Sequence, residues 1–94
     1  MIRQTVQVKD PLGLHARAAA KLVRLASRYA SEIYLSRESA AQRIDAKSIL
    51  GILMLAASAG TRLELCISGK DEEEALEALV KLFEAGFGEE RVPE

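Results

Sequence analysis

The chain has few residues of several informative types, and each scarcity excludes a class of protein. Its single cysteine, Cys66, can form no intramolecular disulfide and supplies no cysteine-based metal site. The 13 Lys and Arg residues against 14 Asp and Glu give a formal net charge of -1, without the basic excess typical of nucleic-acid binding. No apolar run approaches the ~20 residues of a membrane-spanning helix. We therefore predict no metal, no cofactor, and neither nucleic acid nor membrane as a partner.

The length and the composition indicate one ordinary globular domain. The chain has 94 residues, of which 49% are hydrophobic and 29% charged, so it has enough apolar side chains for one core. Gly86 and Gly88 precede a charged end, which predicts a domain over residues 1–88 and a flexible tail over residues 89–94. The start shows no secretory signal, and we expect a cytoplasmic monomer.

The apolar pattern predicts seven elements in the order βαββαβα. Alternation of apolar and polar residues predicts strands over residues 2–8, 32–36, 42–44 and 61–68. Apolar residues at steps of three and four predict helices that begin at Ala16, after Ser48 and at the acidic cluster 71–74. Each strand has one apolar face, so we expect an α+β two-layer open-faced sandwich, with a mainly antiparallel sheet and all helices on one side. In the last strand Cys66 should face solvent.

The sole histidine, His15, lies in a glycine-containing loop directly before the first predicted helix. The first N–H groups of a helix lack intrahelical partners and, with the helix dipole, favour an anion. A phosphoryl group on His15 would therefore meet the N–H groups of Ala16, Arg17 and Ala18. The Arg17 guanidinium adds a fork suited to phosphate oxygens. On composition alone, an inert exposed histidine is the simpler interpretation, and the flanking residues decide against it.

Residues 13–20, Gly-Leu-His-Ala-Arg-Ala-Ala-Ala, resemble the Gly-[Leu/Ile/Met]-His-Ala-Arg-Pro-Ala motif of the HPr phosphocarriers of the phosphotransferase system. Residues 47–53 are similar to the regulatory-serine signature of that family, and the element order agrees over residues 1–88. The resemblance implies a phosphocarrier rather than an enzyme. It implies that His15 takes a phosphoryl group on Nδ1 from phosphorylated enzyme I, fed by phosphoenolpyruvate, and passes it to an enzyme IIA-type acceptor.

Two positions depart from the family pattern. Ala18 stands where the motif has proline, and Leu12 where many members have a small polar residue. Alanine is a strong helix former, so we expect altered transfer kinetics and retained phosphorylation. Leu12, the apolar run 53–55 and the glutamates 72–74 look more like the nitrogen-related branch. Sugar uptake and nitrogen-related regulation both stay open.

The serine before the second helix, Ser48, has two candidate roles. Local physics favours a helix N-cap, and the resemblance adds phosphorylation by a serine kinase. A phosphate would place about -1.5 to -2 charges beside the apolar residues that follow. A short helix cannot turn all of its apolar side chains inward, so Leu50 and Leu53 should be exposed. We predict partner docking by Lys21, Arg24, Ile49, Leu50 and Leu53.

Two other functions compete with the relay. A regulatory adaptor would act through Ser48 with little carrier flux, and the intact sequence His15-Ala16-Arg17 favours the relay over it. A hydrolase or transferase would need a second acid or base near His15, and no recognisable motif supplies one.

Overall fold

Four strands form one antiparallel sheet in the spatial order β1-β4-β2-β3. The computed structural model describes residues 1–38 and 40–88. In chain order the strands are β1 (Ile2–Gln7), β2 (Glu32–Arg37), β3 (Ile44–Asp45) and β4 (Arg62–Ser68). The alternating segments of the sequence thus become strands, and the two longest pairings join β4 to β1 and to β2.

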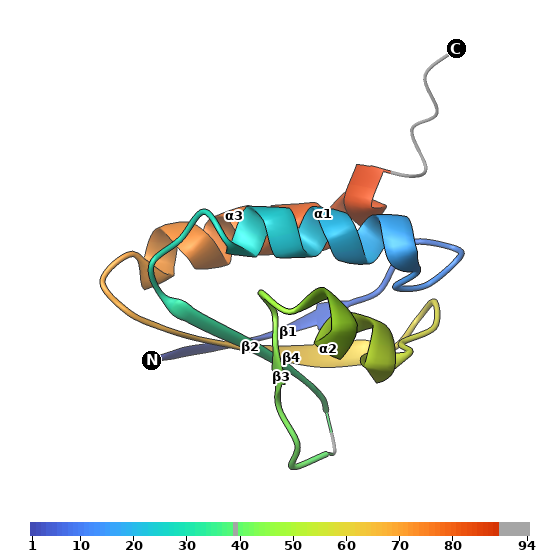
Figure 1. Cartoon of the computed structure of the whole chain (residues 1–94), viewed down its shortest axis with the longest axis horizontal. Helices are drawn as coiled ribbons and strands as arrows, with labels where there is room; N and C mark the ends of the chain where they lie inside the picture. Colours follow the sequence, from blue (N-terminus) through green and yellow to red (C-terminus); the bar gives the residue numbers. More distant parts are fainter. Residues whose placement is uncertain (39, 89–94) are drawn as a thin grey trace.

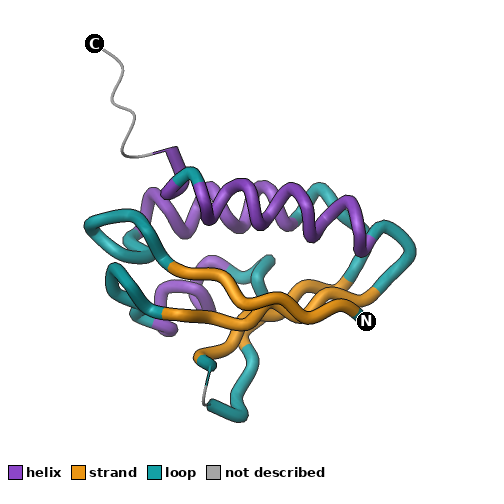
Figure 2. Tube along the Cα trace, turned by 180° about the vertical axis from the view of Figure 1, so that it is seen from behind, coloured by secondary structure: helices purple, strands orange, loops and turns teal. Residues whose placement is uncertain are grey.

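The helices lie on one side of this sheet, as Figures 1 and 2 show from opposite sides. They are α1 (Ala16–Ala26), α2 (Ile49–Leu55) and α3 (Glu72–Glu84), followed by the short 3₁₀ turn η1 (Gly86–Gly88). Helices α1 and α3 run side by side along the sheet, whereas the shorter α2 sits near its edge strand β3 (Figure 1). The predicted α+β open-faced sandwich of order βαββαβα is confirmed.

The hydrophobic core lies between the sheet and the helices. Strand β4 contributes Leu63, Leu65 and Ile67, all fully buried, because alternate residues of a strand face the same side. The facing helices contribute small and large residues: Ala18, Ala19, Leu22 and Ala26 from α1, and Ala75, Leu79 and Phe83 from α3. Phe87 of η1 closes the layer, edge-to-face against Phe83 with 5.0 Å between ring centroids.

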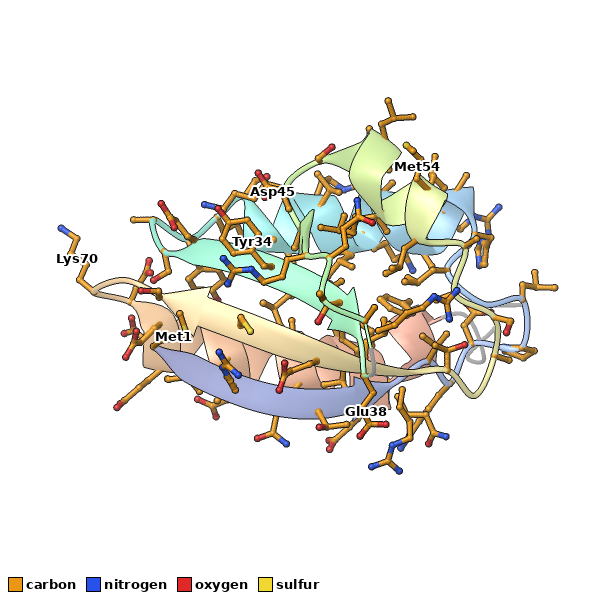
Figure 3. All side chains as sticks on the ribbon, turned by 90° about the horizontal axis from the view of Figure 1, so that it is seen from below. Met1, Tyr34, Glu38, Asp45, Met54 and Lys70 are labelled. Atoms are coloured by element: carbon orange, nitrogen blue, oxygen red, sulfur yellow. The ribbon has the colours of Figure 1, made fainter. Side chains whose placement is uncertain are left out.

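The third strand and Cys66 differ from the sequence predictions. The third strand is Ile44–Asp45 instead of residues 42–44, because these two residues pair with Leu35 and Tyr34. Cys66 is only 4% exposed, so its predicted exposure was wrong. Strand β4 is central, and neighbouring strands place Arg3 and Tyr34 directly beside Cys66. Figure 3 looks onto this open face, where Tyr34 is labelled.

Two further predictions concern the C-terminal tail and membrane-spanning helices. The predicted tail, residues 89–94, lies outside them, so the domain boundary at residue 88 stays a prediction. Within residues 1–38 and 40–88, no helix is long and apolar enough to cross a membrane.

Candidate functional site

A tight loop between β1 and α1 presents His15. The Asp10 side chain begins it, because Oδ1 accepts a hydrogen bond of 2.8 Å from the Leu12 N–H. The Gly13 N–H donates to the Asp10 carbonyl at 2.9 Å, and the Leu14 N–H donates to the Ala57 carbonyl at 2.8 Å. The loop is thus fixed both internally and to the segment after α2, which lies at the same end of the molecule (Figure 1).

The close approach of this loop to Ala57 requires glycine at position 13. Gly13 has a φ of +73°, a conformation that residues with a Cβ rarely adopt. A Cβ placed there would lie 2.6 Å from the Ala57 carbonyl oxygen. Glycine is therefore required in the sequence motif for a steric reason, because it lets the backbone directly before His15 pass close to Ala57.

His15 is the N-cap residue of α1, and its side chain does not cap the helix. Its backbone is extended, with φ -75° and ψ 179°, and its carbonyl accepts from the Ala19 N–H at 2.8 Å. Because no side-chain cap bond forms, the imidazole leaves the first N–H groups of α1 to other acceptors. Ala16 and Arg17 are exposed, whereas Ala18 has no exposed surface. Of the three predicted backbone donors, the first two belong to accessible residues.

The imidazole contacts a buried carboxylate, that of Asp10, which the sequence analysis did not single out. His15 Nε2 lies 3.1 Å from Asp10 Oδ2, and the two side chains are 24% and 1% exposed. The ring is therefore partly open to solvent on one side and held from the other. Only the five-residue spacing of Asp10 and His15 could have suggested this pair, and such a spacing in a loop predicts no contact by itself.

The basic side chains along α1 do not form one uniform surface. Arg17 and Arg24 are exposed, at the first and last turns of the helix. Lys21, predicted with Arg24 as a docking residue, is half-buried, and its Nζ donates a 2.8 Å hydrogen bond to the Phe87 carbonyl. Its ammonium thus links α1 to η1, so a structural contact accompanies any role in docking.

The start of α2 is capped as the sequence predicts. Ser48 has extended backbone angles, and its Oγ accepts a 3.1 Å hydrogen bond from the Gly51 N–H. A Cβ at Gly51 would lie 2.7 Å from Ile44 Cγ2 and 3.3 Å from Ser48 Oγ. Glycine in the 47–53 segment therefore lets α2 lie close to β3 and keeps the serine cap in place.

The outer side of α2 is apolar and exposed. The predicted exposure of Leu50 and Leu53 is confirmed, at 65% and 38%. Ile49 and Met54 are also exposed, and Met54 lies at the edge of the molecule opposite β1 (Figure 3). We call Ile49, Leu50, Leu53 and Met54 the α2 apolar surface. Ile52, in contrast, is fully buried and anchors the helix to the core.

Comparisons with known proteins agree with this geometry. The family model described as the PTS HPr component phosphorylation site matches residues 2–85. The chain belongs to the HPr family. It is 46% identical over 90 residues to the phosphocarrier protein HPr of Treponema pallidum, a match that covers 96% of this chain and 100% of that protein.

Two solved HPr-type structures have a fold similar to that of this chain. HPr-C-His from Thermoanaerobacter tengcongensis is 43% identical and superposes with a TM-score of 0.87, over 94% of this chain and 97% of that one. Crh, the Bacillus subtilis catabolite repression HPr, is 40% identical with a TM-score of 0.64, over 87% and 95% of the two chains. This chain is therefore similar to both an HPr and a protein named for catabolite repression.

Proposed function

We propose that this protein is a cytoplasmic phosphoryl carrier that accepts a phosphoryl group on His15 Nδ1 from phosphorylated enzyme I and donates it to an enzyme IIA-type acceptor. The observation that carries the proposal is the position of His15. It is the N-cap residue of α1 yet makes no cap bond, and its side chain is 24% exposed. The helix start is thus open to an anion attached to the ring.

The transfer needs one nucleophile and a set of fixed donors. The unprotonated imidazole nitrogen attacks phosphorus, so a new N–P bond forms as the bond between phosphorus and the donor breaks. The N–H groups of Ala16 and Arg17 and the helix dipole then favour the phosphoryl oxygens. Arg17 adds a guanidinium at the exposed first turn. The same groups stabilise the phosphoryl oxygens in the second step, when the acceptor takes the phosphoryl group.

These residues suit a carrier better than an enzyme with turnover of its own. A hydrolase would need a positioned general base to activate water. Among residues 1–38 and 40–88, the one carboxylate bonded to His15 is that of Asp10, which is 1% exposed and already accepts from the Leu12 N–H. The proposed reaction therefore uses partner enzymes for catalysis, and this chain supplies the phosphorylated intermediate.

Partner docking would use the surface beside the loop that presents His15. The α2 apolar surface and Leu12, which is 75% exposed, provide apolar area at this end of the molecule. Arg24 provides an exposed positive charge on α1 that can steer acidic partners. An apolar centre beside a charged rim is the usual anatomy of a transient interface.

Phosphoenolpyruvate and enzyme I, added to the purified chain, test the proposal directly. Phosphorus NMR should show an acid-labile phosphoramidate that is absent without enzyme I and absent in His15→Ala. Ser48→Ala is the matched control and should be phosphorylated like the parent. A chain that stays unmodified, or a signal that persists in His15→Ala, contradicts the proposal.

A second candidate function is a regulatory adaptor that is phosphorylated on Ser48 by a serine kinase. The similarity to Crh and the position of Ser48 directly before the α2 apolar surface favour it. A phosphate at a helix start is tolerated electrostatically, because the first N–H groups can donate to its oxygens. Its negative charge would oppose apolar docking. Labelling by a serine kinase, with no acceptance from enzyme I, would favour this function over the carrier.

A further inference from the structure

Asp10 is the one buried carboxylate among residues 1–38 and 40–88. Every other Asp and Glu of the described residues keeps part of its surface in contact with solvent, whereas the Asp10 side chain is 1% exposed. Burial of a carboxylate is costly unless hydrogen bonds or an opposite charge compensate it. Its partners should therefore show why the fold retains a charge at this place.

Both oxygens of Asp10 have a partner in the loop that presents His15. Oδ1 accepts from the Leu12 N–H at 2.8 Å, and Oδ2 lies 3.1 Å from His15 Nε2. An ionised carboxylate can only accept hydrogen bonds, so Nε2 must be the donor in this pair. In the neutral ring the hydrogen then sits on Nε2, and Nδ1 carries the lone pair.

We propose that Asp10 is a positioning residue that holds His15 in the Nε2–H tautomer and thereby makes Nδ1 the nucleophile. The effect on phosphoryl transfer rests on the proposed function, whereas the tautomer of the free ring does not. In the transfer step Nδ1 gains phosphorus, Nε2 keeps its hydrogen, and the ring acquires one positive charge. The Asp10 carboxylate faces that charge and offsets it, without taking up a proton.

The substitution Asp10→Asn separates this role from the turn. The asparagine oxygen would keep the hydrogen bond from the Leu12 N–H, so its NH₂ group would face Nε2. A donor there requires Nε2 to accept, which moves the ring hydrogen to Nδ1. In a catalytic Ser-His-Asp triad the same exchange leaves the geometry intact and lowers the rate because the wrong tautomer results. The variant thus inverts the tautomer at nearly constant shape.

Asp45→Asn is the matched control. Asp45 Oδ1 also accepts from the N–H two residues ahead, that of Lys47, at 2.9 Å. Asp45 is exposed and lies in β3, outside the loop that presents His15, so its replacement removes the same charge and preserves the same kind of turn. Any effect of charge or of turn chemistry in general should appear in both variants.

The measurement is nitrogen NMR of the isotope-labelled imidazole at a pH where the ring is neutral, on parent and both variants without any partner. We expect the Nε2–H form in the parent and in Asp45→Asn, and the Nδ1–H form in Asp10→Asn. Phosphorylation by phosphorylated enzyme I should be slowed about 10- to 100-fold in Asp10→Asn alone. Thermal unfolding checks that all three proteins are folded.

Each outcome bears on the inference. A parent ring in the Nδ1–H form overturns it, and this spectrum decides even if Asp10→Asn fails to fold. An inverted tautomer with an unchanged transfer rate also overturns it, because the tautomer that Asp10 sets would then not decide which nitrogen attacks phosphorus. A parent that shows the Nε2–H form but takes no phosphoryl group supports the tautomer assignment and contradicts the proposed function instead.

Discussion

The starts of α1 and α2 use the same backbone groups in opposite ways. At α2 the N-cap side chain serves the helix, because Ser48 Oγ accepts from the Gly51 N–H at 3.1 Å. At α1 the N-cap residue His15 turns its ring to Asp10 and makes no cap bond. A capped start contributes stability, whereas an uncapped start keeps donors available for an anion. The comparison shows that α1 gives up a local stabilising contact where the proposed chemistry occurs.

The loop before α1 offers the largest expected effect on stability. Gly13→Ala would put a Cβ 2.6 Å from the Ala57 carbonyl oxygen at a φ of +73°. Conformational strain and overpacking together should lower the free energy of unfolding by roughly 3 kcal/mol. Urea unfolding measures this change.

Gly60→Ala is the matched control for that substitution. Gly60 also has a positive φ, +89°, but a Cβ there would meet nothing within 4 Å. It should cost only the conformational strain, about 1–2 kcal/mol. Equal losses at the two positions would show that the close approach to Ala57 is unimportant for the loop that presents His15.

The exposed guanidinium at the first turn of α1 tests whether the open helix start binds phosphate. Arg17→Ala should slow phosphoryl acceptance on His15 about tenfold, because one charge-assisted donor to the phosphoryl oxygens is lost. Stopped-flow mixing with phosphorylated enzyme I at moderate salt measures the rate.

Arg24→Ala removes the same charge at the last turn of α1. At moderate salt it should transfer at the parental rate, and only at low salt should its association slow, because steering is screened by ions. If Arg17→Ala and Arg24→Ala slow the reaction equally at moderate salt, the effect is one of overall charge, and Arg17 has no special role at the helix start.

Much of this site could be predicted from the sequence, because local patterns encode it. The 3.6-residue period predicted that α1 begins directly after His15, and the position of Ser48 before an apolar run predicted the N-cap of α2. The Asp10–His15 contact could not be predicted, since it depends on the backbone path of a loop. The predicted exposure of Cys66 was wrong for a related reason. Alternation shows which face of the strand a residue lies on, whereas the burial of Cys66 depends on the strand order, which places Arg3 and Tyr34 beside it.

The capped helix offers the converse test of the comparison. Ser48→Ala should lower the free energy of unfolding by about 1 kcal/mol through loss of the cap, and Ser48→Asp should retain most of it. Neither should alter phosphoryl acceptance chemistry at His15, although Ser48→Asp adds a charge beside the α2 apolar surface and should weaken docking.

Ser58→Ala is the control for this pair. Ser58 is exposed, and its Oγ lies 3.4 Å from Thr61 Oγ1, so its replacement should change the free energy of unfolding by less than about 0.5 kcal/mol. A Ser48→Ala protein as stable as Ser58→Ala would remove the energetic difference between the two helix starts. Thermal and urea unfolding, together with the enzyme I assay, measure both sides of the comparison.

The third helix start, at α3, sharpens the comparison through its response to acid. Asp71 is the N-cap of α3 but makes no cap bond, and its carboxylate instead accepts from the Ser31 hydroxyl and from the Ala30 and Ser31 N–H groups. The Ser31 hydroxyl first, and then the Ala30 N–H, hold the pKa of Asp71 below its ordinary value. The folded state therefore binds this proton less tightly than the unfolded chain does.

The sign of the pH effect follows from that direction. A carboxyl group with a lowered folded pKa contributes stability above its unfolded pKa of about 3.9, and this contribution is lost as the pH falls through the folded value. The melting temperature of the parent should thus fall more steeply on acidification below about pH 5 than that of Asp71→Asn. Because the Asp71 carboxylate bonds to Ala30 and Ser31, which follow the end of α1 opposite to His15, phosphoryl acceptance at neutral pH should be the same in both proteins. Parallel acid profiles would mean that the contacts with Ser31 and Ala30 do not distinguish the ionised form of Asp71 from the protonated one.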